Sequence, residues 1–263
     1  MQRSPVSPEI DCGDARDNHI PSPQVTESGK LPARDFEEIR LAEALERGRC
    51  PVCDARQEAS YAALRGLARE GATDRGLRAQ MDKGLGFCKP HSVGLSKMAL
   101  LQTSSQLATA VLLDAVLRRR LATLKKLSGN DASGQVRGLA EVSDARCPVC
   151  ARTAEASAAA VRRLVELSAD AAWSMALGSA EICLDDLYAL WAASAGGSKD
   201  VQARWSAIVA AQRKRLEALQ KTLAEYAHNS TSDRRHLITP EQHAAAAASI
   251  RLFGGTPDRD RQR

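Results

Sequence analysis

The pentapeptide Arg-Cys-Pro-Val-Cys occurs twice in this chain, at residues 49–53 and again at residues 146–150. The agreement continues past the cysteines, because Glu-Ala-Ser follows at residues 58–60 and at residues 155–157 with the same spacing. After a shift of two residues, a third cysteine of the first copy also matches one of the second, Cys88 with Cys183. A match of this extent indicates an internal repeat, in which each copy forms one supersecondary unit.

The composition predicts an all-α fold. Aromatic residues make up only 3% of the 263 residues, so a core has to be built mainly from Ala, Leu and Val. Long segments rich in Ala, Leu, Arg and Glu have helical spacing, and alternating patterns typical of strands are nearly absent. We expect two related helical hairpins, each closed by its own Cys-rich metal site, packed through their long helices into a bundle.

The chain divides into four parts. Residues 1–34 contain five of the ten prolines and few apolar residues, so they are expected to be a disordered N-terminal tail. Residues 35–130 form the first repeat, and residues 131–255 form the second repeat together with a C-terminal helix. The last residues, 256–263, are expected to be a charged tail.

Capping signals locate several helices. Asp35 is a suitable N-cap for a first helix, in which Phe36, Ile39 and Leu45 are expected to share the buried face. A single long helical stretch is expected from Ser96 to Leu127.

A matching stretch follows the second copy over residues 201–230. In the C-terminal part, Thr239 and Gln242 have the spacing of a capping box, with Pro240 at the first helical position.

The first predicted metal site has the pattern C-x2-C-x34-C-x2-H, formed by Cys50, Cys53, Cys88 and His91. Three thiolates and an imidazole satisfy tetrahedral zinc, and the absence of an open position is typical of a structural site. The intervening segment is long enough for a helical hairpin, so we expect the ion to hold the two ends of that hairpin together.

The second copy provides Cys147, Cys150 and Cys183, but the position matching the histidine is Asp186. A carboxylate is a zinc ligand, so these four residues predict a Cys3Asp site. Two alternatives remain open: this site binds no metal, or its fourth ligand exchanges and allows chemistry there.

Zinc is the favoured metal for both sites, and an iron–sulfur cluster is the alternative, because clusters are also held by Cys and in some cases by His. A thioredoxin-like use of the CPVC motifs requires a βαβ context, which the pattern does not contain. No catalytic set is found elsewhere in the chain, so the sequence favours a protein that is not an enzyme.

The cysteine elements Cys-Pro-Val-Cys at residues 50–53 and Gly-Phe-Cys-Lys-Pro-His at residues 86–91 resemble those of an uncharacterised bacterial family, a domain of unknown function with CPxC and GFCxxH elements. The resemblance covers roughly residues 35 to 255. It implies a bacterial, cytosolic, helical protein with a metal site at the first ligand set, and it implies no reaction.

Charge and hydropathy limit the partners that we expect. The formal net charge is +5, with basic and acidic residues mixed along most helical stretches, which favours a protein partner over nucleic acid. A nucleic-acid-binding regulator is the alternative, with Arg118–Arg120 and Lys125–Lys126 as its contacts. No apolar run is long enough to span a membrane and no signal peptide is recognised, so a cytoplasmic protein without membrane insertion is expected. The oligomeric state is left open.

Overall fold

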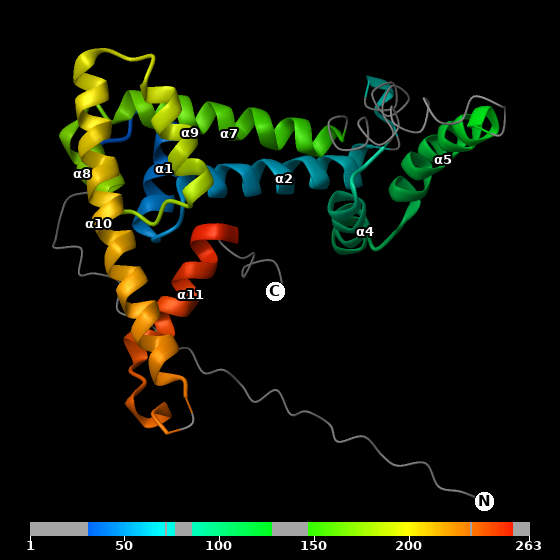
Figure 1. The fold of residues 1–263 in the computed structure, drawn as a ribbon. Coiled ribbons are helices and arrows are strands. Elements are labelled where there is room, and N and C mark those ends of the chain that lie inside the picture. Colours follow the sequence, from blue (N-terminus) through cyan, green and yellow to red (C-terminus); the bar gives the residue numbers. More distant parts are fainter. Residues whose placement is uncertain (1–30, 72, 77–85, 128–146, 232, 255–263) are drawn as a thin grey trace, which may run out of the picture.

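The computed structural model describes residues 31–71, 73–76, 86–127, 147–231 and 233–254, and in this part of the chain it is helical without a strand (Figure 1). The all-α prediction is therefore confirmed. The α-helices are α1 (Phe36–Glu46), α2 (Pro51–Glu70), α4 (Lys89–Thr103), α5 (Leu107–Leu127), α7 (Pro148–Leu167), α8 (Ala171–Ser179), α9 (Leu184–Ser194), α10 (Lys199–Asn229) and α11 (Pro240–Gly254), with a short 3-10 helix, η1 (Arg235–Leu237).

The centre of the fold is the pair α2 and α7, which begin in the two CPVC motifs and lie side by side (Figure 1). The pair is antiparallel. Arg56 near the start of α2 contacts Ser157 in the middle of α7, whereas Gly66 and Leu67 near the end of α2 lie beside Pro148 at the start of α7. A 20-residue helix is about 30 Å long, so each helix carries its CPVC motif to the far end of the other.

Two hydrophobic cores form at the two ends of this pair, and both repeats contribute to each of them. The first core combines α1 and the start of α2 with the helices of the second repeat, and the second core combines the end of α2, α4 and α5 with the start of α7. Fully buried members of the first are Val52, Leu164, Trp173, Leu177, Leu190 and Trp205. Those of the second are Leu95, Ala99, Leu112, Cys147 and Val149.

The valine of each CPVC motif shows most directly that each repeat contributes residues to the core of the other. Val52 belongs to the first repeat by sequence but is fully buried in the core formed mainly by the second repeat. Val149 is its equivalent and is fully buried among the helices of the first repeat. Burying a side chain of this size contributes about 1.5–3 kcal/mol relative to exposure, so each motif stabilises the other repeat as well as its own helix.

The first helix begins at Asp35 as predicted, and the carboxylate of this residue accepts a hydrogen bond of 2.8 Å from the amide of Glu38. The predicted buried face of this helix was wrong for two of its three residues, whereas Leu45 does pack against the core. Phe36 and Ile39 are exposed, and the helix buries Leu41 and Ala42 together with Glu38. Glu38 can occupy this face because Arg163 of α7 donates to its carboxylate at 2.6 Å, which compensates the buried charge.

The long helix expected from Ser96 to Leu127 is interrupted between α4 and α5. Ser104 adopts a left-handed conformation with φ 50°, and Gln106 Nε2 donates to the carbonyl oxygen of Ser96 at 3.2 Å. Thr103 Oγ1 donates to the carbonyl oxygen of Ser105 at 3.0 Å, and the hydroxyl of Ser105 accepts from the amide of Leu107 at 3.2 Å. Ser and Thr side chains compete with helical hydrogen bonds in this way. The short polar stretch between the two apolar segments therefore turns the chain.

The expectation that the long helices of the two repeats pack on each other was also wrong. α5 and α10 lie at opposite ends of the molecule, on either side of the α2 and α7 pair (Figure 1). α10 packs instead on α8, α9 and α11, and α5 packs on α2 and α4.

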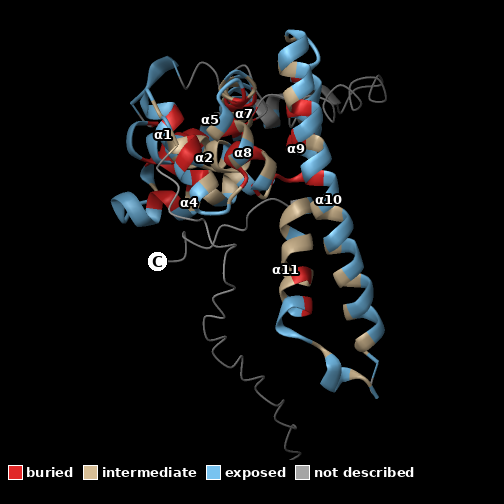
Figure 2. Cartoon of the chain, turned by 90° about the vertical axis from the view of Figure 1, so that its left-hand side faces the viewer, coloured by how far each residue is buried: buried red, intermediate tan, exposed pale blue. Residues whose placement is uncertain are grey.

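The C-terminal helix begins with the predicted capping box, in which Thr239 N and Gln242 N each donate to the other residue's side chain at 3.3 Å. α11 then returns along α10, and Figure 2 shows this hairpin extending away from the buried centre. No helix among the described residues is long and apolar enough to cross a membrane. The expected tail up to residue 30 and the charged tail 256–263 lie outside the described residues. So do residues 131–138, Asp-Ala-Ser-Gly-Gln-Val-Arg-Gly, which the sequence predicts as the linker between the repeats.

Two glycines provide a matched stability test. Gly86 has φ +95°, and a Cβ built on it lies 2.6 Å from Val116 Cγ1, whereas a Cβ on the exposed Gly66 of α2 meets nothing within 4 Å. Gly86→Ala is expected to lower the free energy of unfolding by about 2 kcal/mol or more through strain and overpacking. Gly66→Ala is expected to raise it by about 0.5–1 kcal/mol. Urea denaturation of both variants measures the two changes in the free energy of unfolding. Equal changes in the two variants would contradict the described backbone at Gly86.

Candidate metal centres

Four helices begin in the same way, with a cysteine at the N-cap. These cysteines are Cys50 for α2, Cys88 for α4, Cys147 for α7 and Cys183 for α9. None of their side chains makes a capping hydrogen bond to its own helix. The residue three positions later, in the first turn, carries the next candidate ligand, and N-cap and N3 side chains face each other at a helix start. The x2 spacing therefore gives two neighbouring ligands at each helix N-terminus.

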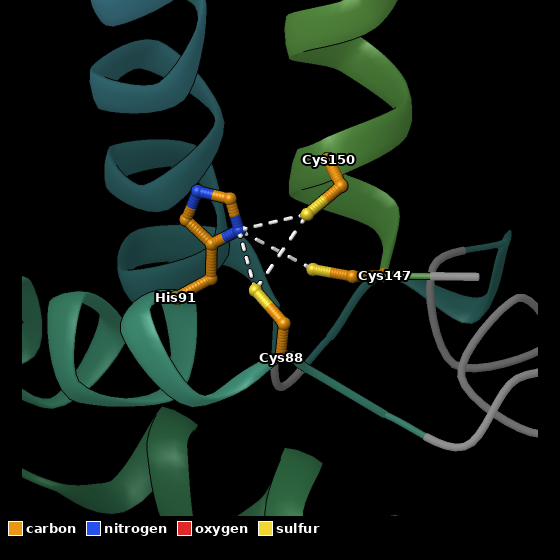
Figure 3. Close-up of side chains that lie close together, drawn as sticks. All are labelled: Cys88, His91, Cys147 and Cys150. Atoms are coloured by element: carbon orange, nitrogen blue, oxygen red, sulfur yellow. Dashed lines mark hydrogen bonds between the residues drawn. The ribbon is translucent and has the colours of Figure 1, made fainter. Parts of the chain in front are cut away.

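The N-termini of α4 and α7 meet at one cluster, which we name the histidine centre: Cys88, His91, Cys147 and Cys150. His91 Nδ1 lies 3.0 Å from the sulfur of Cys88, 3.5 Å from that of Cys147 and 3.3 Å from that of Cys150. In Figure 3 the imidazole nitrogen points between the three sulfur atoms, two of them from the start of α7 and one from the start of α4.

The N-termini of α2 and α9 meet at a second cluster, which we name the aspartate centre: Cys50, Cys53, Cys183 and Asp186. Asp186 Oδ2 lies 3.3 Å from the sulfur of Cys50, 3.1 Å from that of Cys53 and 2.9 Å from that of Cys183. One carboxylate oxygen thus contacts all three thiols.

The structure contradicts the predicted division of these eight residues. Cys50 and Cys53 were expected to lie with Cys88 and His91, but each CPVC pair meets the third cysteine and fourth ligand of the other repeat. The reason is the length of α2 and α7. Because each helix runs unbroken for 20 residues from its CPVC motif, the chain reaches its third cysteine at the opposite end of the helix pair. There the motif of the antiparallel partner helix is the nearer one.

The separations between the ligand atoms match one small ion. The sulfur atoms of Cys88 and Cys150 are 3.6 Å apart, and Cys183 has its sulfur 3.5 Å from that of Cys53 and 4.0 Å from that of Cys50. Zinc–sulfur bonds of about 2.3 Å in a tetrahedron separate two sulfur atoms by about 3.8 Å. A disulfide requires about 2.05 Å, and the cysteines of the described part of the chain are free thiols. Cys12 lies outside the described residues.

The two centres differ in exposure. In the aspartate centre Cys50, Cys183 and Asp186 are buried and Cys53 is half-buried. In the histidine centre only Cys147 is buried, while the other three ligands are half-buried.

Each fourth ligand also has a partner on its outer side. Ser60 of α2 lies with its hydroxyl 3.5 Å from Nε2 of His91. Arg56 of α2 donates to Oδ1 of Asp186 at 2.7 Å, which leaves Oδ2 directed at the thiols. Outer contacts of this kind orient metal ligands. Sequence reasoning missed both Arg56 and Ser60; the available signal was that Thr153 takes the place of Arg56 in the other repeat.

The ionisation of the thiols reflects their crowding. Contact with Cys183 raises the pKa of Cys53 to about 12, with burial adding to the effect. The pKa of Cys183 is likewise raised to about 12, by contact with Cys50 and by burial. Burial raises the pKa of Cys150 to about 12.

The pKa values of the fourth ligands, Asp186 and His91, are lowered, in contrast to those of the thiols. The pKa of Asp186 is lowered although its burial acts to raise it, because the three thiols and Arg56 stabilise the carboxylate. Burial lowers the pKa of His91, which favours the neutral imidazole that a metal ligand must be.

A comparison with protein-family models, with curated proteins and with solved structures finds no match to this chain. Its function therefore has to be inferred from the arrangement of the eight residues.

The raised thiol pKa values predict proton release on metal binding. A thiol with a pKa near 12 is protonated at pH 7, whereas Asp186, with its lowered pKa, is already ionised. Zinc binding at the aspartate centre should release about three protons, one from each thiol, and zinc affinity should fall as the pH is lowered. Calorimetric titration in buffers of different ionisation enthalpy counts these protons. Release of about one proton or fewer would contradict the described ionisation.

Proposed function

We propose that each centre binds one zinc ion and that the protein is a non-enzymatic, zinc-stabilised helical scaffold for protein interaction or regulation. The observation that carries this proposal is the convergence of four ligand atoms within 4.8 Å of one another in each of two clusters. Structural zinc sites use four protein ligands from the set Cys, His and Asp. Because all four positions around each ion are then filled, no position is left for a substrate.

The geometry favours a single ion over an iron–sulfur cluster. The ligands of a multi-iron cluster bind different iron atoms, so they surround a larger group than one ion. In the histidine centre the three sulfur atoms all lie within 3.5 Å of the single atom Nδ1 of His91. A spacing this small suits ligands that share one ion.

The aspartate centre is also better interpreted as a structural site than as a labile one. Asp186 is 3% exposed and is held by Arg56 from the outer side. An exchange that moved the carboxylate away from the thiols would also break this ion pair in a buried site, which is costly.

The interaction role is supported by apolar side chains that the fold leaves exposed. Leu113, Leu117 and Leu121 lie four residues apart along α5, with Leu107 preceding them. A row at this spacing is typical of a helix that docks on an apolar groove of a partner protein.

Nucleic-acid binding is less favoured. Arg118, one of its expected contacts, is paired with Asp114 in the same helix. The side chains of Arg119, Arg120, Lys125 and Lys126 lie outside the described ones. We also propose a cytosolic location, because free paired thiols suit a reducing compartment. The cysteine elements further support membership of the bacterial family with CPxC and GFCxxH elements.

The proposal predicts the metal content of the purified protein and its effect on stability. Anaerobically isolated protein should be colourless and contain about two zinc ions per chain. Removal of zinc by a strong chelator should lower the melting temperature by more than about 10 °C, since binding free energy in such sites is folding free energy. Elemental analysis and thermal denaturation measure both results.

Returning zinc after the chelator has been removed serves as the control and should restore the melting temperature. If the isolated protein were instead brown, contained iron and showed visible absorption bands, the bound group would be an iron–sulfur cluster and not zinc. An unchanged melting temperature after complete metal removal would contradict a structural role for either metal.

A further inference from the structure

The outer contacts of the two centres involve equivalent serines of the two repeats. Ser60 and Ser157 occupy the same position after their CPVC motifs. The hydroxyl of Ser60 lies 3.5 Å from Nε2 of the ligand histidine. The hydroxyl of Ser157 accepts a hydrogen bond of 3.0 Å from Nε of Arg56, which in turn contacts Asp186. The chain of contacts is thus histidine to serine in one centre, and aspartate to arginine to serine in the other.

Arg56 makes three contacts from its one guanidinium group. Besides Ser157, it donates through Nη2 to Asp186 Oδ1 at 2.7 Å and lies with Nη1 3.9 Å from the sulfur of Cys53. It therefore contacts two of the four ligands and joins α2, α7 and α9. At the equivalent position of the second repeat stands Thr153, whose hydroxyl donates to the carbonyl oxygen of Cys150 and contacts no ligand atom by a described bond.

The charges of the two ligand sets explain why only one of them has this arginine. Three thiolates and a neutral imidazole around Zn²⁺ leave a formal charge of about −1. Replacing the imidazole by a carboxylate makes that charge about −2, at a centre where Asp186 is 4% exposed at its side chain. Uncompensated charge is costly when buried. The positive charge of the Arg56 guanidinium brings the formal charge of the aspartate centre back to about −1, the value of the histidine centre.

We propose, on the basis of the zinc binding proposed above, that Asp186 and Arg56 act as one unit that replaces the ligand histidine of the other centre. Arg56 is the positioning residue of this unit. It fixes Oδ1 so that Oδ2 faces the thiolates, neutralises the added negative charge and makes the connection to Ser157 that His91 makes to Ser60.

A simple surface ion pair does not account for these contacts. Ion pairs that are exposed on both sides contribute little to stability and do not depend on a metal. Here the carboxylate is buried, the arginine is half-exposed, and the same guanidinium reaches a second ligand, Cys53. Metal affinity at the aspartate centre, measured separately from stability, is therefore the property that Arg56 should control.

The test compares zinc affinity at the two centres in Arg56→Thr, which copies the residue present in the other repeat. Zinc affinity at the aspartate centre should fall by about 10–100-fold, as is typical when an outer partner of a ligand is removed. Affinity at the histidine centre should stay within a few-fold, which also shows that the variant is folded. Competition with a chromophoric chelator measures both affinities.

Rescue distinguishes the proposed role from a merely structural one. In the double variant Arg56→Thr with Asp186→His, the aspartate centre receives the ligand and the threonine of the other centre, and its zinc affinity should return to within a few-fold of the wild type. Arg56→Lys, which keeps the charge but not the planar fork, should lose less affinity than Arg56→Thr. Cobalt substitution reports the ligand set through its visible absorption bands.

Arg163→Met is the matched control, because Arg163 also pairs with a buried carboxylate, that of Glu38, but contacts neither centre. It should lower stability and leave both zinc affinities unchanged. An unchanged zinc affinity in Arg56→Thr, or no recovery of affinity in the double variant, would overturn the inference. If the wild-type chain still bound two zinc ions in that case, the proposed function would stand. Wild-type protein that binds no zinc would instead refute the proposed function.

Discussion

Two pairs of helix N-termini facing each other are the constraint on which this structure depends. Each N-terminus carries a partial positive charge and unpaired amide groups, so two of them placed close together repel unless negative charge lies between them. The cysteines supply that charge once their thiols ionise, and Asp186 adds a further carboxylate. A bound cation would then join the two sets of ligands. The same arrangement thus accounts for the ligand spacing and the helix starts, and it favours binding of a cation.

The exchange of CPVC motifs between the repeats makes the two halves of the molecule interdependent. Each motif places a fully buried valine in the core formed mainly by the other repeat and two thiols in the ligand cluster at that end. Neither core is complete without the partner repeat, and each ion would join both. In this respect the internal repeat resembles a symmetric dimer within one chain, in which the same surface contacts its own equivalent. The antiparallel pair α2 and α7 is the element that both halves share.

Much of the fold could be predicted from the sequence. Helical spacing predicted the all-α fold, Asp35 and Thr239 located helix starts, and the cysteine pattern predicted two clusters of four residues. Which CPVC pair joins which third cysteine could not be predicted, because a spacing of 34 residues does not show whether the chain turns back on itself. An unbroken helix of 20 residues carries the chain about 30 Å away from its CPVC motif instead. The uninterrupted segment after each CPVC motif was the overlooked signal. Arg56 was missed because its role appears only when Asp186, 130 residues away, is brought beside it.

The most direct test of the exchange is the zinc content of two double variants that remove the same number of thiols. Cys50→Ser with Cys183→Ser removes two ligands of one centre, so about one zinc ion per chain should remain. Cys50→Ser with Cys88→Ser removes one ligand from each centre, so both should lose tight binding and almost no zinc should remain. If the second variant instead retained about one tightly bound ion and the first retained none, the ligands would pair within each repeat and the exchange of motifs would be contradicted.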